Sequence, residues 1–274
     1  MTKIKLVLCQ MNVVDDKEEN LKKASLMIAS ASKKADIIVL PEMFNCPYSN
    51  DKFIEYGENE KDSRTLNKIS LLACENNVYI LAGSIPEKEE DKLFNTSYLF
   101  DRQGKIIAKH RKMHLFDIDV KDKITFKESD VLTAGNDFTL ADTEFGKIGI
   151  GICYDIRFPE LARILVENGA LILFYPGAFN MTTGPAHWEL LFRSRALDNQ
   201  VFCVGVAPAL NKDASYHSYG HSIITNPWGE VLAEADEKED IIFSEIDLSE
   251  IKKVREELPL LKNKREDLYK VTKK

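Results

Sequence analysis

The stretch of residues 147–160, near the middle of the chain, constrains the fold most. It reads KIGIGICYDIRFPE. Isoleucines that alternate with glycines are typical of a strand, and a proline after the polar residues suits the first position of a helix because its φ angle is fixed. We therefore predict a strand, a sharp turn and a helix. Cys153 lies at the turn, beside backbone N–H groups that are free to hold an anion, although most cysteines are simply buried in a core.

Strands and helices alternate along the chain. Continuous apolar runs at residues 36–40 and 170–175 are typical of strands that are buried on both faces. Apolar residues recur at helical spacing over residues 18–33 and 65–76, which predicts amphipathic helices that cover a sheet. This alternation predicts an α/β fold, in which ligands bind at the carboxyl ends of the strands. Pro41 and Glu42 end the first apolar run, so Glu42 is a candidate site residue, although a glutamate at such an edge is more often simply solvated.

A predicted hairpin leads into a cluster of basic residues. Residues 94–100 and 105–109 have the pattern of two paired strands around a turn that ends in Gly104. The second strand runs into Lys112, which is flanked by histidines and an arginine. Residues 115–135 show little periodicity, so we expect a long loop there. Loops of that length in a compact domain are usually functional.

The remaining elements complete a chain without a linker. The sequence predicts further helices that begin near residues 161 and 185, a last helix over 249–257, and further strands at residues 3–10, 78–82, 138–140, 201–206, 220–225, 230–235 and 240–246. The charged tail from about residue 258 to 274 is either a docking arm or a solvated end. No break in composition divides the 274 residues, which predicts a single domain over residues 1–274.

Charge and cysteine content exclude several classes of partner. Lys and Arg total 37 against 44 for Asp and Glu, a net charge of −7, which argues against nucleic acid or an anionic membrane as a partner. No apolar run reaches the length of a signal peptide or a membrane span, so we expect a cytoplasmic protein. The five cysteines are odd in number and lack CxxC spacing, which suggests neither a disulfide framework nor a zinc site.

Three predicted element ends carry an acid, an amine and a thiol: Glu42, Lys112 and Cys153. A cysteine at its reference pKa is mostly protonated at neutral pH, so it needs a base or a positive neighbour to attack a carbonyl group. Glu42 can supply the base. Lys112 can supply the positive charge and, with the backbone N–H of Tyr154, can hold the negative oxygen of a tetrahedral intermediate.

Histidines offer two alternative interpretations. The usual partner of a catalytic thiol is a histidine, and the chain has five of them: His110, His114, His187, His217 and His221. None is predicted at a strand end that converges on Cys153, which disfavours a Cys–His hydrolase. A metal site at His217 and His221 lacks a third ligand cluster, so no metal is expected.

Three separated motifs carry a resemblance to a known family. PEMF around Glu42, KHRKMHLFDID around Lys112 and GICYDIRFPE around Cys153 resemble, in this order, the Glu-Lys-Cys motifs of the nitrilase superfamily of carbon–nitrogen hydrolases. NCPYSNDKF, YPGAFNMTTGPAHWELLFRSRALDNQ and NPWGEVLAEA are more narrowly similar to the omega-amidases. Those enzymes hydrolyse the terminal amide of short α-keto dicarboxylic monoamides, such as α-ketoglutaramate and α-ketosuccinamate.

The resemblance implies a fold, an assembly and a mechanism. The implied fold is a four-layer α-β-β-α sandwich that forms a homodimer through its outer helices and uses no metal or organic cofactor. The implied roles are general base for Glu42, stabiliser of the tetrahedral intermediate for Lys112, nucleophile for Cys153, and a second carboxylate that orients Lys112 for Glu128. The thiol forms a thioester with release of ammonia, and water then hydrolyses the thioester.

Two other functions compete with this interpretation. One is an amidase for a larger substrate, such as deaminated glutathione, and the other is a non-catalytic interaction protein that keeps the fold.

The sequence also departs from many omega-amidases, which have a Pro-Gly turn after the HLFDID segment. Residues 120–123 read VKDK here, so we expect the loop over the site to close differently.

An α-keto acid substrate brings a carboxylate that needs a partner when it is desolvated. A forked guanidinium is the preferred partner, and Arg157 follows the thiol by four residues. The alternative for Arg157 is a surface position or a salt bridge with Glu160. We expect Asp155 to fix the turn through backbone hydrogen bonds and not to touch substrate.

Further substrate contacts are expected from residues on both sides of the thiol. Tyr48 is positioned to hydrogen-bond the substrate, with packing as its alternative. Tyr154 contributes through its backbone N–H. Phe179, Thr182 and Thr183 are expected to line the wall of the site.

Overall fold

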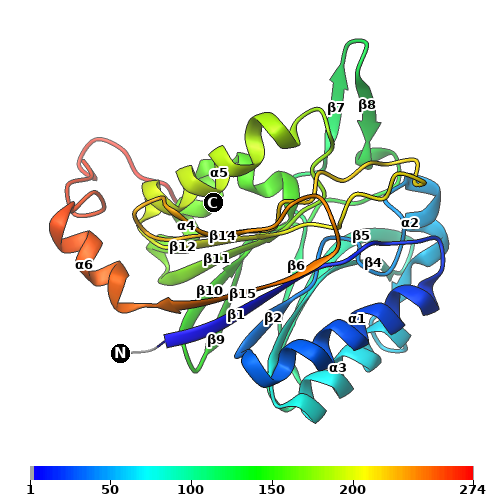
Figure 1. The fold of residues 1–274 in the computed structure, drawn as a ribbon. Coiled ribbons are helices and arrows are strands. Elements are labelled where there is room, and N and C mark those ends of the chain that lie inside the picture. The colour runs from blue at the N-terminus through cyan, green and yellow to red at the C-terminus, as the bar shows by residue number, and fades with distance from the viewer. Residues whose placement is uncertain (1–2, 274) are drawn as a thin grey trace.

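The computed structural model describes residues 3–273, and its first sheet holds seven strands (Figure 1). Their order is β15-β1-β2-β4-β5-β6, and β3 pairs with β4. The central strands β1, β2 and β4 are parallel, whereas β15 and β5 run antiparallel to their neighbours. The strands are β1 (Lys3–Gln10), β2 (Ile37–Val39), β3 (Glu58–Asn59), β4 (Tyr79–Glu89), β5 (Lys92–Phe100), β6 (Ile106–Arg111) and β15 (Asp240–Asp247).

The second sheet holds six strands in the order β14-β13-β12-β11-β10-β9. β10, β11 and β12 are parallel, and β11 carries the apolar run at residues 170–175 that predicts a buried strand. The strands are β9 (Thr139–Thr143), β10 (Gly146–Ile150), β11 (Ala170–Pro176), β12 (Phe202–Val206), β13 (Ile223–Thr225) and β14 (Val231–Glu234).

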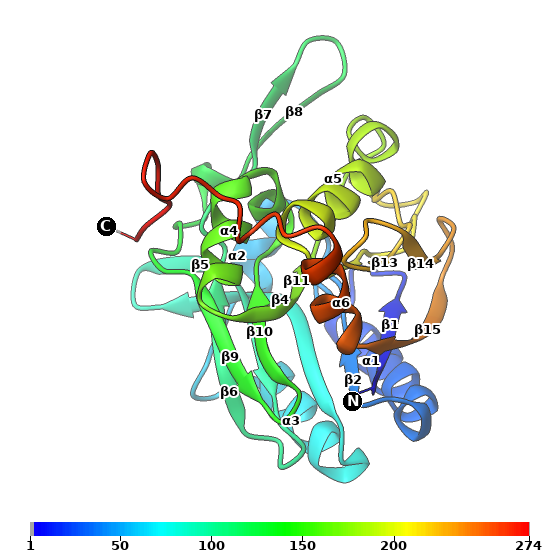
Figure 2. The same ribbon diagram turned by 90° about the vertical axis from the view of Figure 1, so that its left-hand side faces the viewer.

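The two sheets face each other and helices cover their outer sides, as the two views show (Figures 1 and 2). One apolar cluster lies between the sheets and includes Leu6 of β1 and Ile150 of β10. A second lies between the first sheet and two helices, α1 (Lys17–Ala31) and α3 (Arg64–Asn76). A third lies between the second sheet and α4 (Pro159–Glu167) and α5 (Gly184–Asn199). The predicted four-layer α-β-β-α sandwich is therefore confirmed, whereas the division into one domain over residues 1–274 stays a prediction.

The prediction of a long loop over residues 115–135 is wrong. The segment contains the antiparallel hairpin of β7 (Asp117–Val120) and β8 (Ile124–Lys127), followed by a short 3-10 turn, η2 (Glu128–Asp130). Figure 1 shows the hairpin projecting from the body of the molecule. Its turn lacks the glycine that usually marks a hairpin, and Asp122 adopts a φ of 59° in place of one. For this reason the segment carries no ordinary turn signal.

Other boundaries differ less. The short helix α2 (Asn50–Tyr56) was not expected, because seven residues carry too little periodicity to be recognised. By contrast, α6 (Ser249–Glu257) has the predicted bounds. The tail after it docks on the chain itself, since Lys264 pairs with Glu167 and Lys273 pairs with Asp137 at 2.7 Å. Among the described residues, no helix is both long and apolar enough to cross a membrane.

Candidate active site

The turn that carries Cys153 has the predicted form. β10 ends at Ile150, a short 3-10 turn, η3 (Cys153–Arg157), follows, and α4 begins at Pro159. Cys153 has a φ of 47°, in the left-handed region that non-glycine residues rarely adopt. Strain of this kind clusters at functional sites because the surrounding structure must hold it in place. Gly177 packs against the turn so closely that a Cβ atom there would lie 3.2 Å from the Cα of Cys153.

Glu42 and Lys112 form a buried ion pair at the ends of β2 and β6. Both side chains have no exposed surface, and Lys112 Nζ lies 3.0 Å from Glu42 Oε1. Glu42 also accepts hydrogen bonds from Asn95 Nδ2 at 2.8 Å and from the backbone N–H of Ala178 at 2.7 Å. The carboxylate is therefore held in one orientation by three donors. Asn95 and Ala178 were not expected at the site, because neither a strand asparagine nor a backbone amide gives a sequence signal.

Glu128 binds the other side of Lys112. Its Oε1 lies 2.9 Å from Lys112 Nζ and accepts a hydrogen bond from the Tyr48 hydroxyl at 2.6 Å. Its Oε2 accepts from the backbone N–H of Phe116 at 2.7 Å. One ammonium thus lies between two carboxylates that are themselves fixed, so Lys112 has little freedom to move.

The pKa shifts in this cluster follow from burial and charge. Burial raises the pKa of the Glu42 carboxyl, and the positive charge of Lys112 offsets this only in part. Burial lowers the pKa of the Lys112 ammonium, but the negative charges of Glu128 and Glu42 outweigh burial and hold that pKa well above its usual range. Lys112 therefore stays charged at neutral pH.

Cys153 is the neutral member of the group. Burial, followed by the negative charge of Glu42, raises the pKa of its thiol well above the usual range. The thiol is only 4% exposed and lies close enough to Glu42 and Lys112 for both charges to affect it. A resting thiolate would add a further negative charge to a buried site that already holds two carboxylates and one ammonium. The arrangement favours a thiol that loses its proton to Glu42 only as it attacks.

Three of the five histidines bond to partners other than the thiol. His110 and His114 both bond to Asp155, at 3.0 and 2.7 Å, and His187 lies 3.1 Å from Arg157. This geometry gives no support to a Cys–His pair. Within residues 3–273, no group of three or more potential ligands is arranged to hold a metal ion.

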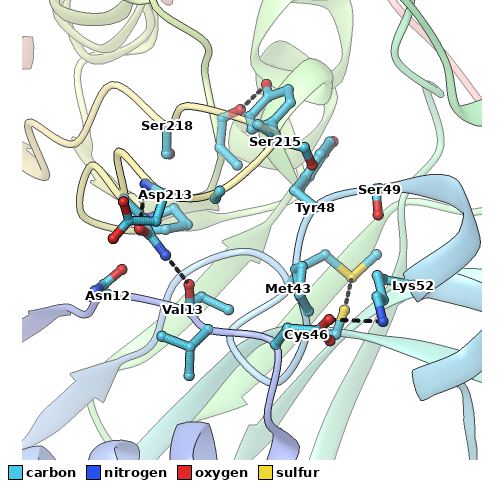
Figure 3. Close-up of a pocket in the computed structure, with 18 of the residues that line it drawn as sticks. Asn12, Val13, Met43, Cys46, Tyr48, Ser49, Lys52, Asp213, Ser215 and Ser218 are labelled. Carbon is cyan, nitrogen blue, oxygen red and sulfur yellow. Dashed lines mark hydrogen bonds and ion pairs between the residues drawn. The ribbon is translucent and has the colours of Figure 1, made fainter.

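A cavity of about 500 Å³ reaches Glu42. One wall comes from the segment after β2, with Met43, Cys46 and Tyr48, and the facing wall comes from the loop before β13, with Ser215 and Ser218 (Figure 3). The loop also contributes a residue that the sequence did not reveal. Tyr216 packs against Tyr48 with ring centroids 4.6 Å apart, and its hydroxyl bonds to the Ala178 carbonyl.

The expected substrate residues lie in different surroundings. Of the six, only Tyr48 lines the cavity, and its hydroxyl is already engaged by Glu128. The side chain of Tyr154 packs among aromatic rings, 5.3 Å from that of Phe116. The backbone N–H groups of Thr182 and Thr183 both donate to Asn180.

Arg157 and Phe179 form one unit beside the thiol. The guanidinium carbon of Arg157 lies 4.6 Å from the centre of the Phe179 ring, and Cys153 is close enough to affect the pKa of the guanidinium. Burial lowers that pKa from its ordinary value. Among the described residues, no carboxylate lies within ion-pair distance of Arg157, so the alternative salt bridge with Glu160 is not formed.

Comparison with known proteins identifies the family. The model for the carbon-nitrogen hydrolase family matches residues 5–256. Omega-amidase NIT2 of Bos taurus is 50% identical over 272 residues, which cover 99% of this chain and 98% of the bovine protein. Crystal structures of Nit3 from Saccharomyces cerevisiae, described as a member of branch 10 of the nitrilase superfamily, and of the C. elegans NitFhit protein have the same fold. Nit3 has a TM-score of 0.88 at 44% identity and covers 96% of this chain and 97% of its own.

NitFhit has a TM-score of 0.90 at 35% identity and covers 98% of this chain and 66% of its own. The fold and the buried acid–amine–thiol group thus agree with the sequence comparison. The chain belongs to the carbon–nitrogen hydrolase family, within the nitrilase superfamily, and is a hydrolase of carbon–nitrogen bonds in amides.

Proposed function

We propose that this enzyme is an omega-amidase that converts short α-keto dicarboxylic monoamides, such as α-ketoglutaramate and α-ketosuccinamate, to the keto acid and ammonia. The observation that carries the proposal is the half-buried guanidinium of Arg157, which has no acidic partner among the described residues and lies beside the thiol. An amide substrate with a distant carboxylate would supply the missing partner. The 50% identity to the bovine omega-amidase supports the same substrate class.

The reaction begins with proton transfer from Cys153 to Glu42. The sulfur attacks the amide carbon, and the oxygen gains a negative charge that the Lys112 ammonium stabilises. The backbone N–H of Tyr154 is a second donor, because it lies in the first turn of η3, where N–H groups lack partners within the helix. Glu42 then returns the proton to the nitrogen, and ammonia leaves as the thioester forms.

Hydrolysis of the thioester uses the same groups. Water gives a proton to Glu42 and attacks the thioester carbonyl, and Lys112 again stabilises the negative oxygen. Collapse of this second intermediate expels the sulfur, which recovers its proton from Glu42. Glu128 serves throughout to orient Lys112. No cofactor is required by any step.

The remaining site residues have supporting roles in this proposal. Arg157 pairs with the substrate carboxylate through two parallel hydrogen bonds while it rests on Phe179. Thr182 and Thr183, at the start of α5, complete the wall. Tyr48 acts through Glu128 as well as through the cavity wall.

We further propose a homodimer in the cytoplasm. Leu190 and Leu197 on α5 are 63% and 40% exposed, and Trp228 is 47% exposed on the β13–β14 turn. Apolar surface of this kind on an outer helix suits a second copy of the chain. Light scattering that gives twice the chain mass of 31.2 kDa would support the dimer. All five cysteines are free thiols, which suits a reducing compartment.

The central test is release of ammonia from α-ketoglutaramate by the wild-type enzyme and by Cys153→Ala. We expect the substitution to reduce kcat by at least about 10⁴-fold, because it removes the thiol that lies close enough to both Glu42 and Lys112 for their charges to affect it. Cys203→Ala, at a buried cysteine on β12, is the matched control and should retain activity. Undiminished release by Cys153→Ala would show that the nucleophile is misassigned.

The larger-substrate alternative needs a direct comparison, because a cavity of about 500 Å³ has room for more than a five-carbon amide. We expect kcat/KM to be higher for α-ketoglutaramate than for deaminated glutathione. The reverse order would replace the omega-amidase proposal by the larger-substrate one. A thioester adduct on Cys153, detected by mass spectrometry after rapid quenching, would exclude a non-catalytic protein.

A further inference from the structure

Asp155 is a buried charged residue that the proposed reaction does not use. Its side chain has no exposed surface and accepts four hydrogen bonds. Oδ1 accepts from the backbone N–H of His114 at 3.0 Å and lies 2.7 Å from the Nδ1 atom of the same residue. Oδ2 accepts from the backbone N–H of Ile152 at 2.9 Å and lies 3.0 Å from His110 Nε2. Both oxygens are therefore fully engaged.

These four donors come from the two segments that carry the amine and the thiol. His110 and His114 lie two residues before and two residues after Lys112. Ile152 and Asp155 lie one residue before and two residues after Cys153. One carboxylate thus joins the backbone around Lys112 to the backbone around Cys153.

The two histidine rings are themselves held in place. His110 Nδ1 lies 3.0 Å from Thr139 Oγ1, and that hydroxyl donates to the carbonyl of Lys109. The ring of His114 stacks on that of Phe158 with centroids 3.7 Å apart and planes 12° apart. Phe158 directly precedes α4, so the stack adds a second contact between the same two segments. The connection is rigid because neither ring is free to turn.

The charge on Asp155 persists at all pH values at which the enzyme is expected to work. Burial opposes ionisation of this carboxyl, but the hydrogen bonds from His110 and His114 outweigh burial and hold its pKa well below the usual range. An ionised carboxylate only accepts hydrogen bonds, which is what four converging donors require. A neutral amide of the same shape would place an NH₂ group against two of those donors.

We propose that Asp155 is a positioning residue that sets the distance between the Lys112 ammonium and the Cys153 sulfur by joining the segments that carry them. The proposal deepens the assignment of Lys112 and Cys153 in the proposed function and rests on it. Asp155 touches neither substrate nor the reacting atoms. A displacement of about 1 Å between groups that must act on one carbonyl costs on the order of 10²-fold in rate, so even a small loosening is measurable.

The test measures the reactivity of Cys153 directly, without the amide substrate. Wild-type and Asp155→Asn proteins are alkylated with iodoacetamide at pH 7.5, and mass spectrometry follows the Cys153 peptide against the exposed thiol of Cys74 as an internal reference. We expect Asp155→Asn to slow alkylation of Cys153 by about tenfold, since one unit in thiol pKa changes the thiolate fraction by that factor. Alkylation at the wild-type rate would overturn the proposal.

A double variant separates positioning from a general loss of structure. If Asp155 acts through Lys112, Cys153 in the double variant Asp155→Asn/Lys112→Met should be alkylated at the same rate as in Lys112→Met alone, to within about twofold. A general structural defect would multiply the two losses, and that result would overturn the proposal. In turnover of α-ketoglutaramate, Asp155→Asn should lower kcat by about 10²-fold and change KM by less than about threefold.

The matched control is Glu87→Gln. Glu87 is also a buried carboxylate that binds β6, through Lys109 and Arg111, but it makes no contact with the turn at Cys153. Its substitution should leave the rate of Cys153 alkylation within about twofold of wild type. A loss as large as that of Asp155→Asn would show that any weakening of β6 has the same effect, and would overturn the proposal.

If Asp155→Asn does not fold, His114→Ala repeats the comparison with Lys112→Met. His114 has a side chain 28% exposed, so its loss is easier to tolerate. The same non-additive result is expected, and a multiplicative one would overturn the proposal. If the alkylation rates are as expected but the wild-type enzyme releases no ammonia from α-ketoglutaramate, the positioning role is supported and only the proposed substrate is overturned.

Discussion

At the scale of single residues, the chemistry depends on a proton that is held by sulfur until attack. Cys153, Glu42 and Lys112 are all buried, and burial alone would neutralise each of them. Lys112 keeps its charge because two carboxylates contact it, whereas the thiol has no excess of positive charge beside it. Glu42 must therefore be ionised before the reaction begins, which makes its pKa the property that controls activity at low pH.

The pH dependence of kcat/KM should report this carboxyl. Burial raises the pKa of Glu42, and the protonated acid cannot accept the thiol proton, so activity is present above the raised pKa and is lost as pH falls through it. We expect the acid limb of kcat/KM to lie above about 4.3, the ordinary value for glutamate. Glu42→Gln should abolish the acid limb of the kcat/KM profile and lower the rate by about 10³-fold. A limb below pH 4 in the wild-type enzyme would contradict the role of Glu42.

Arg157 should determine the affinity for the substrate carboxylate. We expect Arg157→Lys to raise KM for α-ketoglutaramate by about tenfold, because an ammonium cannot reproduce two parallel hydrogen bonds. In the same variant, the KM for an uncharged amide of similar size should change by less than about twofold. Arg163→Lys, on α4, is the matched control. An unchanged KM in Arg157→Lys would place the carboxylate pocket elsewhere.

At the scale of elements, two loops that are far apart in sequence fix the second carboxylate. Tyr48, which precedes α2, and Asn50, the first residue of α2, each donate a hydrogen bond to the segment of β8 and η2. The Tyr48 hydroxyl donates to Glu128 Oε1 at 2.6 Å, and Asn50 Nδ2 donates to the carbonyl of Lys127 at 2.8 Å. The first contact reaches Lys112 through Glu128, whereas the second only joins the two loops.

Tyr48→Phe tests whether this hydroxyl orients Glu128 or binds substrate. Loss of a hydrogen bond to a charged group is worth about 1.5–3 kcal/mol, so we expect kcat to fall by about tenfold or more with KM unchanged. Asn50→Ala loosens the same two loops without touching Glu128, and its kcat should stay near that of wild type. A rise in KM with an unchanged kcat would instead assign the hydroxyl to the substrate.

At the scale of the whole molecule, buried and half-buried carboxylates couple stability to pH. The pKa values of Asp155, Glu58 and Glu87 are lowered because hydrogen bonds and positive neighbours outweigh the effect of burial. A carboxyl with a lower pKa in the folded state stabilises the fold above its unfolded pKa, and this contribution disappears as pH falls through the folded value. The raised pKa values of Glu42 and Glu250 act in the opposite direction.

The free energy of unfolding in urea should therefore fall as pH decreases from about 4.5 to 3, the range below the ordinary pKa of these carboxyls. Glu87→Gln should flatten this dependence, because one of the three groups no longer titrates. Urea titrations at constant ionic strength would measure both effects. A free energy that stays constant over this range would show that the unfolded state keeps the same interactions.

The sequence by itself determined the elements that periodicity and turn chemistry encode. Buried strands such as β11 and the strand–turn–helix at Cys153 are local features, since alternating apolar residues, glycines and a proline act over a few neighbours. The candidate acid, amine and thiol were also visible, because each ends a recognisable element. The hairpin β7–β8 was not, since its turn at Asp122 lacks the usual glycine.

Only the tertiary structure decided what these residues contact. The hydrogen bonds that hold Glu42 come from Asn95 and from the Ala178 backbone, which are 53 and 136 residues away in the chain. The link between Asp155 and the two histidines likewise spans 45 and 41 residues. Local sequence cannot specify such contacts, because they arise when two sheets pack against each other and bring the ends of distant strands to one place.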